Sequence, residues 1–117
     1  MEKLTNHQKI IVLMSREPTK FFFPYDFMRD DLGQLFVGYM ADRRLRELKA
    51  EYPDIFEVKQ QGKYTTCRLR MENIKDWYYT LPNHLRAVLR VEGHEPSESA
   101  EEGLARLNLE FADDQRR

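Results

Sequence analysis

One change of pattern constrains the fold most: at Pro53 the spacing of apolar residues switches from the period of a helix to that of strands. Before this proline, apolar residues recur at i, i+4, i+7 and i+11, which places them on a single helix face: Ala41, Leu45, Leu48 and Tyr52. Pro53 ends the helix because a proline has no backbone N–H to donate and disfavours the helical conformation in the residue before it. The sequence therefore predicts a helix that stops at Pro53.

Two strand-like runs follow the proline directly. Residues 55–58 and 64–69 are rich in β-branched and aromatic side chains, and the polar link 59–63 between them contains Gly62. A glycine in a short polar link between two such runs indicates a β hairpin. Because side chains alternate along a strand, the second run is expected to have an apolar side with Cys67, Leu69 and Met71, and a basic side with Tyr64, Thr66, Arg68 and Arg70.

Three further elements are expected before the helix that stops at Pro53. Thr5 can cap a first helix over residues 5–16. Three consecutive aromatic residues at 21–23 favour a short strand, and the apolar spacing of residues 25–32 favours a second short helix ended by Gly33. Together with the hairpin, these elements predict an α+β fold.

Helical spacing returns after the hairpin. Residues 73–91 keep it on both sides of Pro82, which predicts two short helices or one helix kinked at the proline. Their aromatic side chains, Trp77, Tyr78 and Tyr79, are expected in the core, since large aromatic residues are usually well buried. The alternative is that they form a protein-binding surface, or the interface of a homodimer through the helices of residues 73–91.

Length and charge narrow the function classes. At 117 residues the chain has the length of a single domain. Its formal net charge of −1 and pI near 6.3 exclude binding to nucleic acid by bulk charge alone, so a basic site has to be local. Residues 43–70 supply a local excess, with eight Lys or Arg against four Asp or Glu. A single cysteine, no signal-like start and no apolar run of about 20 residues favour a cytoplasmic protein.

The helix before Pro53 distributes its charges unevenly. At about 100° per residue, Arg43 and Arg46 lie opposite the apolar face and Glu47 lies beside them. Arg44 and Lys49 lie on the two flanks. Two interpretations follow: a surface that meets phosphate, or the solvated polar face that any amphipathic helix needs.

The order helix, strand, helix, helix and hairpin over residues 5–71 resembles the winged helix-turn-helix domain. The resemblance is carried by "GYMADRRLRELKAEYPDIFEVKQQGKYTTCRLR", residues 38–70. In that family the third helix enters the major groove and the hairpin, called the wing, touches the flanking backbone. The resemblance implies a DNA-binding recognition helix with Tyr39, Arg43, Arg44, Arg46, Glu47 and Lys49, and a DNA-binding wing with Lys59, Gln60, Gln61 and Lys63.

Glu47 departs from the pattern of a DNA-reading helix, because a carboxylate on the reading face repels phosphate. Three roles are open to it: it accepts from a cytosine amino group, it pairs with a neighbouring arginine, or it indicates a face that does not bind DNA. The sequence does not choose among them.

Residues 1–91 are expected to form the domain with its C-terminal helical extension, and residues 92–117 an acidic, disordered tail. The tail contains "RLNLEF", which is similar to the short peptide that docks bacterial replication and repair proteins on the sliding clamp. The apolar positions match at Leu107, Leu109 and Phe111, whereas Arg106 stands where glutamine is expected. Alternatively, Leu104, Leu107 and Phe111 form one stripe of a helix that folds back on the domain.

The sequence thus favours a sequence-specific duplex DNA-binding protein, expected to be a transcriptional regulator of a bacterium or a phage. The alternatives are a replication or repair accessory protein that uses the tail motif, and a winged helix adaptor for protein contacts. No enzyme, cofactor or metal is expected, because His7, His84, His94 and Cys67 have no metal-ligand spacing and no glycine-rich phosphate loop occurs.

Overall fold

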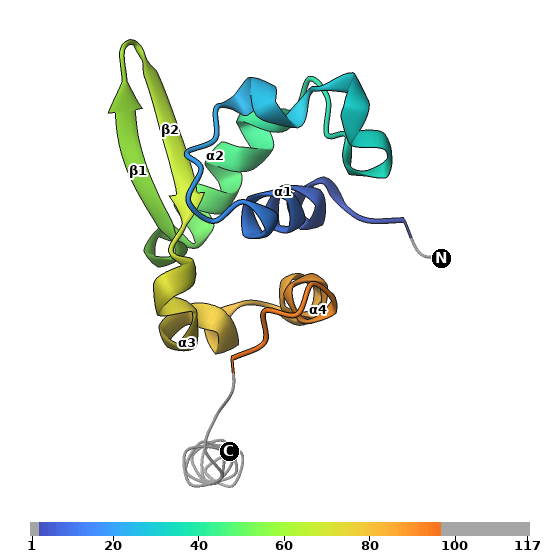
Figure 1. Ribbon diagram of the computed structural model, residues 1–117, viewed down its shortest axis with the longest axis vertical. Helices are drawn as coiled ribbons and strands as arrows, with labels where there is room; N and C mark the ends of the chain where they lie inside the picture. The colour runs from blue at the N-terminus through green and yellow to red at the C-terminus, as the bar shows by residue number, and fades with distance from the viewer. Residues whose placement is uncertain (1–2, 97–117) are drawn as a thin grey trace, which may run out of the picture.

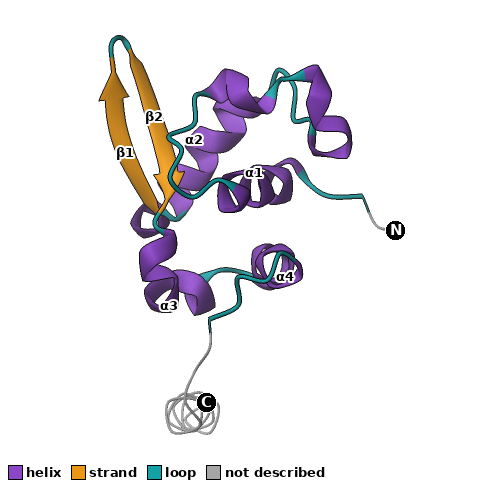
Figure 2. Ribbon diagram, viewed as in Figure 1, coloured by secondary structure: helices purple, strands orange, loops and turns teal. Residues whose placement is uncertain are grey.

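The computed structural model describes residues 3–96 and has an α+β architecture, with helices packed beside one antiparallel hairpin (Figures 1 and 2). The helices are α1 (Asn6–Arg16), α2 (Ala41–Glu51), α3 (Ile74–Trp77) and α4 (Asn83–Val91), and the strands are β1 (Phe56–Gln61) and β2 (Tyr64–Leu69). Short 3₁₀ helices connect them: η1 (Pro24–Phe27), η2 (Asp30–Leu35), η3 (Pro53–Ile55), η4 (Met71–Asn73) and η5 (Tyr78–Thr80).

The first helix begins as its sequence predicts. Thr5 Oγ1 accepts from the backbone N–H of Gln8 at 3.2 Å, and the Gln8 side chain accepts from the backbone N–H of Thr5 at 2.8 Å. This reciprocal capping box satisfies two backbone donors that a helix start otherwise leaves unpaired. The buried residues of α1 face α2 on one side and α4 on the other.

The aromatic run at 21–23 forms less β structure than the sequence predicts. Only Phe22 pairs, through an isolated bridge in which its N–H donates to Cys67 O at 2.7 Å and its carbonyl accepts from Cys67 N at 3.2 Å. The N–H of Phe23 instead donates to the side chain of Asp26 at 2.8 Å. Pro24 follows with no N–H at all, so the ladder cannot continue.

The predicted second helix over residues 25–32 is wrong. This region contains two 3₁₀ helices, η1 and η2, instead of one α-helix, and Gly33 interrupts η2 with a non-helical φ of 59°. The backbone is extended at Arg29 (φ −78°, ψ 138°) between the two 3₁₀ helices, so the hydrogen-bond ladder of an α-helix cannot run through residues 25–32. Phe27 still reaches the core from η1.

The hairpin is confirmed, but its turn is shorter than expected. Six residue pairs run from Phe56 opposite Leu69 to Gln61 opposite Tyr64, so the turn consists of Gly62 and Lys63 alone. Gly62 has a φ of 61°, which side chains with a Cβ rarely adopt. The expected five-residue link is therefore wrong, and its first three residues, Lys59, Gln60 and Gln61, belong to strand β1.

The predicted basic side of the hairpin is largely neutralised. Thr66 is fully buried, and Arg68 Nε donates to Glu57 Oε2 across the strands at 2.6 Å. The ring of Phe21 lies under the Arg68 guanidinium, 4.8 Å from Cζ to the ring centre. Residue alternation cannot predict this, because Phe21 comes from a distant segment.

A single hydrophobic core joins the N-terminal and C-terminal helices. Trp77 and Tyr78 are buried in it, as expected, and Trp77 Nε1 donates to Arg70 O at 2.9 Å. The helical structure is interrupted between η5 and α4, and Pro82 directly precedes α4. This confirms the predicted interruption at the proline. Helix α4 packs against α1, so residues 73–91 are part of the same folded unit (Figure 1).

Within residues 3–96, no helix has both the length and the apolar content needed to cross a bilayer.

Candidate nucleic-acid interface

The outer face of α2 is the predicted recognition surface. Ala41, Leu45 and Leu48 are buried in the core, and Arg43 and Arg46 are exposed. The helix phase read from the sequence is thus confirmed for these five residues. What the face can bind depends on the charges beside the two arginines.

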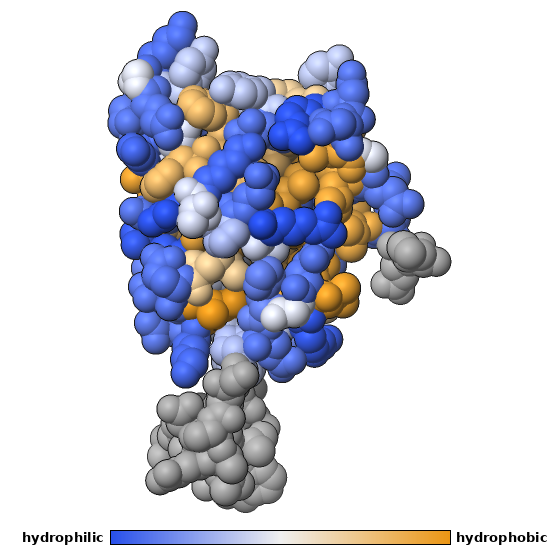
Figure 3. Space-filling model, in the orientation of Figure 1, coloured by the Kyte–Doolittle hydropathy of each residue, from blue (hydrophilic) through white to orange (hydrophobic). Residues whose placement is uncertain are grey.

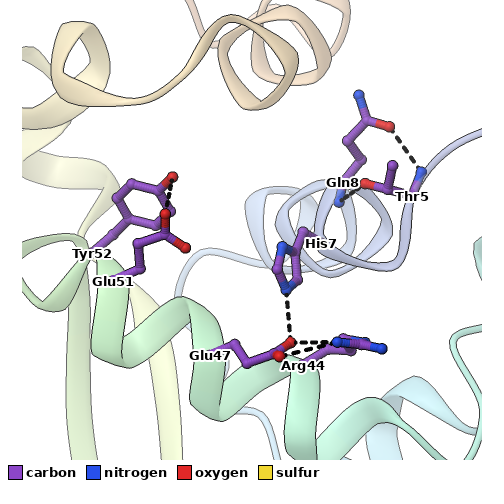
Figure 4. Close-up of polar contacts among 7 residues, drawn as sticks. All are labelled: Thr5, His7, Gln8, Arg44, Glu47, Glu51 and Tyr52. Atoms are coloured by element: carbon purple, nitrogen blue, oxygen red, sulfur yellow. Dashed lines mark hydrogen bonds and ion pairs between the residues drawn. The ribbon is translucent and has the colours of Figure 1, made fainter.

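The Glu47 side chain leans toward α1, although more than a third of it stays exposed. Its Oε1 accepts from Arg44 Nη1 at 2.8 Å on the same helix and from His7 Nε2 at 3.2 Å on α1, so the carboxylate lies in the gap between the two helices (Figure 4). The hydrogen bond from Arg44, and after it that from His7, lowers the pKa of the Glu47 carboxyl below its ordinary value. Of the three open roles, pairing with a neighbouring arginine matches the geometry.

The two flanking cations have separate environments. Arg44 is held by Glu47, so its charge is compensated at the α1 side of the helix. Lys49 is partly buried on the opposite flank, near enough to Cys67 that its positive charge favours the thiolate. Burial has the larger effect and raises the pKa of the Cys67 thiol to about 11, which makes Cys67 a core residue and no nucleophile.

The cations that face solvent on α2 differ in their partners. Arg46 Nε lies 3.3 Å from Asp42 Oδ2, and both side chains are more than half exposed, so this pair is weak and can exchange for another anion. Arg43 has no ion-pair or hydrogen-bond partner within the described residues. Tyr39, just before the helix, is 99% exposed. These three residues form the accessible part of the predicted recognition helix.

The wing contributes fewer free donors than the sequence suggests. Lys63 is at the turn, with Nζ 5.5 Å from the ring centre of Tyr64. Lys59 lies four residues earlier, with Nζ 5.3 Å from the ring centre of Phe21. The side chain of Gln60 donates to Gly62 O at 3.1 Å and that of Gln61 to Thr66 Oγ1 at 3.2 Å, so both amides bond within the hairpin. Lys59 and Lys63 are both exposed and are therefore the wing cations placed for an external contact.

Sequence reasoning missed His7 and Phe21. His7 is 40 positions from Glu47, and Phe21 is 38 positions from Lys59, so neither contact leaves a local signal. Their effect is on the site itself, because His7 helps to hold the Glu47 side chain toward α1 and Phe21 restrains Lys59.

Other predicted sites have different outcomes. The apolar residues of 73–91 are largely used in the core, and Val91 is the large apolar side chain of that segment that is more than a third exposed. A homodimer through these helices stays a prediction. Arg106, Leu107, Leu109 and Phe111 lie outside the described residues. Within the described range, no three His, Cys, Asp or Glu side chains gather as a metal site would require.

No family model, curated protein or solved structure matches this chain.

Proposed function

We propose that the chain is a winged helix protein that binds duplex DNA, with α2 as the recognition helix and the β1–β2 hairpin as the wing. A role in regulating transcription is the expected use of such a domain. The proposal is supported by the order of elements, in which α1, the Phe22 bridge, the η1–η2 segment, α2 and the hairpin follow one another as in that fold.

One observation carries the proposal: Glu47 is turned toward α1 by Arg44 and His7. A carboxylate beside Arg43 and Arg46 repels phosphate, and this arrangement turns it toward α1 and pairs its charge with Arg44, while more than a third of the side chain stays exposed. Arg43 is exposed and has no partner among residues 3–96, with the exchangeable Arg46 one turn away. Arginine suits such a face, because its planar guanidinium can bond a guanine edge or a phosphate through two parallel donors.

The net charge of the face is small, and this determines the expected binding mode. Arg43, the Arg46–Asp42 pair, Lys59 and Lys63 give only a few phosphate contacts, so affinity for random DNA should be modest and should fall steeply as salt rises. Sequence discrimination then depends on base contacts from Tyr39, Arg43 and Arg46.

A protein-interaction adaptor is the second candidate. It is favoured by Tyr39 and Met40, apolar side chains exposed directly before α2, where a DNA-reading surface needs few of them. This candidate predicts no salt-dependent duplex binding.

The test is fluorescence anisotropy with labelled random duplex at two salt concentrations, followed by selection of a preferred sequence. Arg43→Ala combined with Arg46→Ala should weaken binding to the selected sequence by about 1–3 kcal/mol per base contact. Lys75→Ala combined with Arg90→Ala is the matched control: it removes the same charge from exposed positions on α3 and α4 and should have a much smaller effect. Equal affinity of wild type and the Arg43/Arg46 variant would refute the assignment of α2.

A further inference from the structure

A groove of about 910 Å³ lies on a part of the molecule that the proposed DNA surface does not use. Its wall is formed by residues before and within α1, by η2 and the residue after it, and by the end of α4. Figure 3 shows apolar side chains gathered over α1 and between the η2 region and α4. The apolar lining consists of Leu4, Val12, Leu32, Leu35, Phe36, Val88 and Val91.

The rim of this groove is basic. Lys3, Lys9 and Arg16 line it, against one carboxylate, Glu92. Arg16 Nη2 lies 2.6 Å from Glu92 Oε1, and Lys9 Nζ donates to Phe36 O at 3.1 Å, so both cations are positioned at the edge of the apolar floor. A ligand that combines apolar side chains with negative charge fits this lining.

Helix α4 ends at the groove. Val91 is 85% exposed and lines the groove together with Glu92. The helix ends in a Schellman motif, with Gly93 N donating to Arg90 O at 3.0 Å and His94 N to Leu89 O at 2.9 Å. After this cap the chain turns to the other side of α4, where Glu95 lines a separate pocket with Tyr78 and Arg86. A segment beyond Pro96 that reaches the groove therefore has to cross back over α4.

We propose that residues 104–111 of the same chain occupy this groove, with Leu104, Leu107 and Phe111 against its apolar floor. Residues 98–110 carry four carboxylates, Glu98, Glu101, Glu102 and Glu110, against one arginine, which complements the basic rim. The three apolar residues recur at i, i+3 and i+7, the spacing of one helix face.

The lengths agree with this placement. The eight residues from Pro96 to Leu104 reach about 27 Å when extended, which is enough to cross back over a helix about 10 Å wide; α1, along which the groove runs, is about 16 Å long. As a helix, residues 104–111 would cover about 10 Å of that length. A tether of this kind gives the tail a millimolar effective concentration at the groove, so the chain's own segment outcompetes a dilute free partner of equal affinity.

The test places a nitroxide spin label beside the apolar cluster, in Ala112→Cys, and records amide signals of the whole chain. Cys67 is fully buried and its pKa is raised, so the introduced thiol reacts selectively. The amides of Leu35, Phe36 and Val91 should lose most of their intensity compared with the reduced, diamagnetic label. The loss should be abolished by Val91→Glu and retained in Val58→Glu, which adds the same charge at an exposed valine of β1.

Three results would overturn the proposal. Weak broadening spread evenly over the domain would mean that the segment does not dock. Broadening centred on another face would place it elsewhere. Broadening that appears when labelled chains are mixed with unlabelled ¹⁵N chains, and that vanishes on dilution, would make a second copy the occupant. Each result is independent of whether α2 binds DNA.

Discussion

His7 on α1 and Glu47 on α2 are joined side chain to side chain at 3.2 Å, and Arg44 binds the same carboxylate from within α2 (Figure 4). The contact links the first helix of the chain to the helix with the candidate site. It also decides which charges face solvent on α2, because Glu47 and Arg44 neutralise each other on the α1 side. Glu47 therefore affects both the packing of α1 against α2 and the net charge of the outer face of α2.

Glu47 should make stability depend on pH in the acid range. Its folded-state pKa lies below the ordinary 4.5, chiefly through the Arg44 hydrogen bond, so its ionised form stabilises the fold above that value and this contribution is lost as pH falls through the folded pKa. Glu47→Gln should lower the unfolding free energy near neutral pH, and the difference from wild type should shrink in acid. Urea titrations at several pH values measure it. Glu72→Gln, at an exposed position, is the control, and a pH-independent difference would contradict the assignment.

Two acidic residues of α2 should affect DNA binding differently. Asp42 is exposed and competes with phosphate for Arg46, whereas Glu47 faces α1. Asp42→Asn is therefore expected to raise affinity for random duplex at low salt, and Glu47→Gln to raise it less. Anisotropy titrations compare the two, with Asp76→Asn on α3 as the control for general charge. If Glu47→Gln raised affinity as much as Asp42→Asn, the carboxylate would have to be on the DNA-facing side.

Local patterns in the sequence predict those elements whose stability is local. The capping box at Thr5, the apolar face of α2 and the proline at position 82 each act within one or two turns, and all three are found where expected. The 25–32 region fails for a related reason. Its apolar spacing is helical, but the backbone is extended at Arg29 and has a positive φ at Gly33, so short 3₁₀ helices form instead of one α-helix.

The candidate site was harder to predict because its charges are set by tertiary contacts. Helical phase correctly exposes Arg43 and Arg46, but it places Glu47 beside them, since phase takes no account of a histidine 40 positions away. Strand alternation likewise assigns Arg68 to a basic side, whereas Glu57 on the partner strand and Phe21 from another segment compensate it. To predict which charged side chains are exposed and uncompensated, one has to know the strand register and the segments that pack nearby.

The hairpin turn depends on glycine at one position. Gly62 has a φ of 61° and open space around it, so a substitution there costs backbone strain without a clash. Gly62→Ala should lower the unfolding free energy by about 1–2 kcal/mol, the cost of a left-handed conformation for a residue with a Cβ. Gly62→Asn should cost less, because asparagine tolerates this region. Thermal or urea unfolding measures the stability of the two variants. Equal losses of unfolding free energy would contradict the idea that the left-handed conformation at position 62 causes the destabilisation.

The C-terminal helices should be required for folding, although the winged helix resemblance ends at residue 71. Leu89 is fully buried where α4 packs on α1, so Leu89→Ala should cost about 2–5 kcal/mol through lost burial and the cavity left behind. Val91→Ala, in the same helix but 85% exposed, should change stability by about 0.5 kcal/mol or less. A chain ending after residue 72 loses Trp77, Tyr78 and Leu89 from the core and should show no cooperative unfolding transition by circular dichroism. A cooperative transition in that truncated chain would mean that α3 and α4 are an appendage of an independently folded domain.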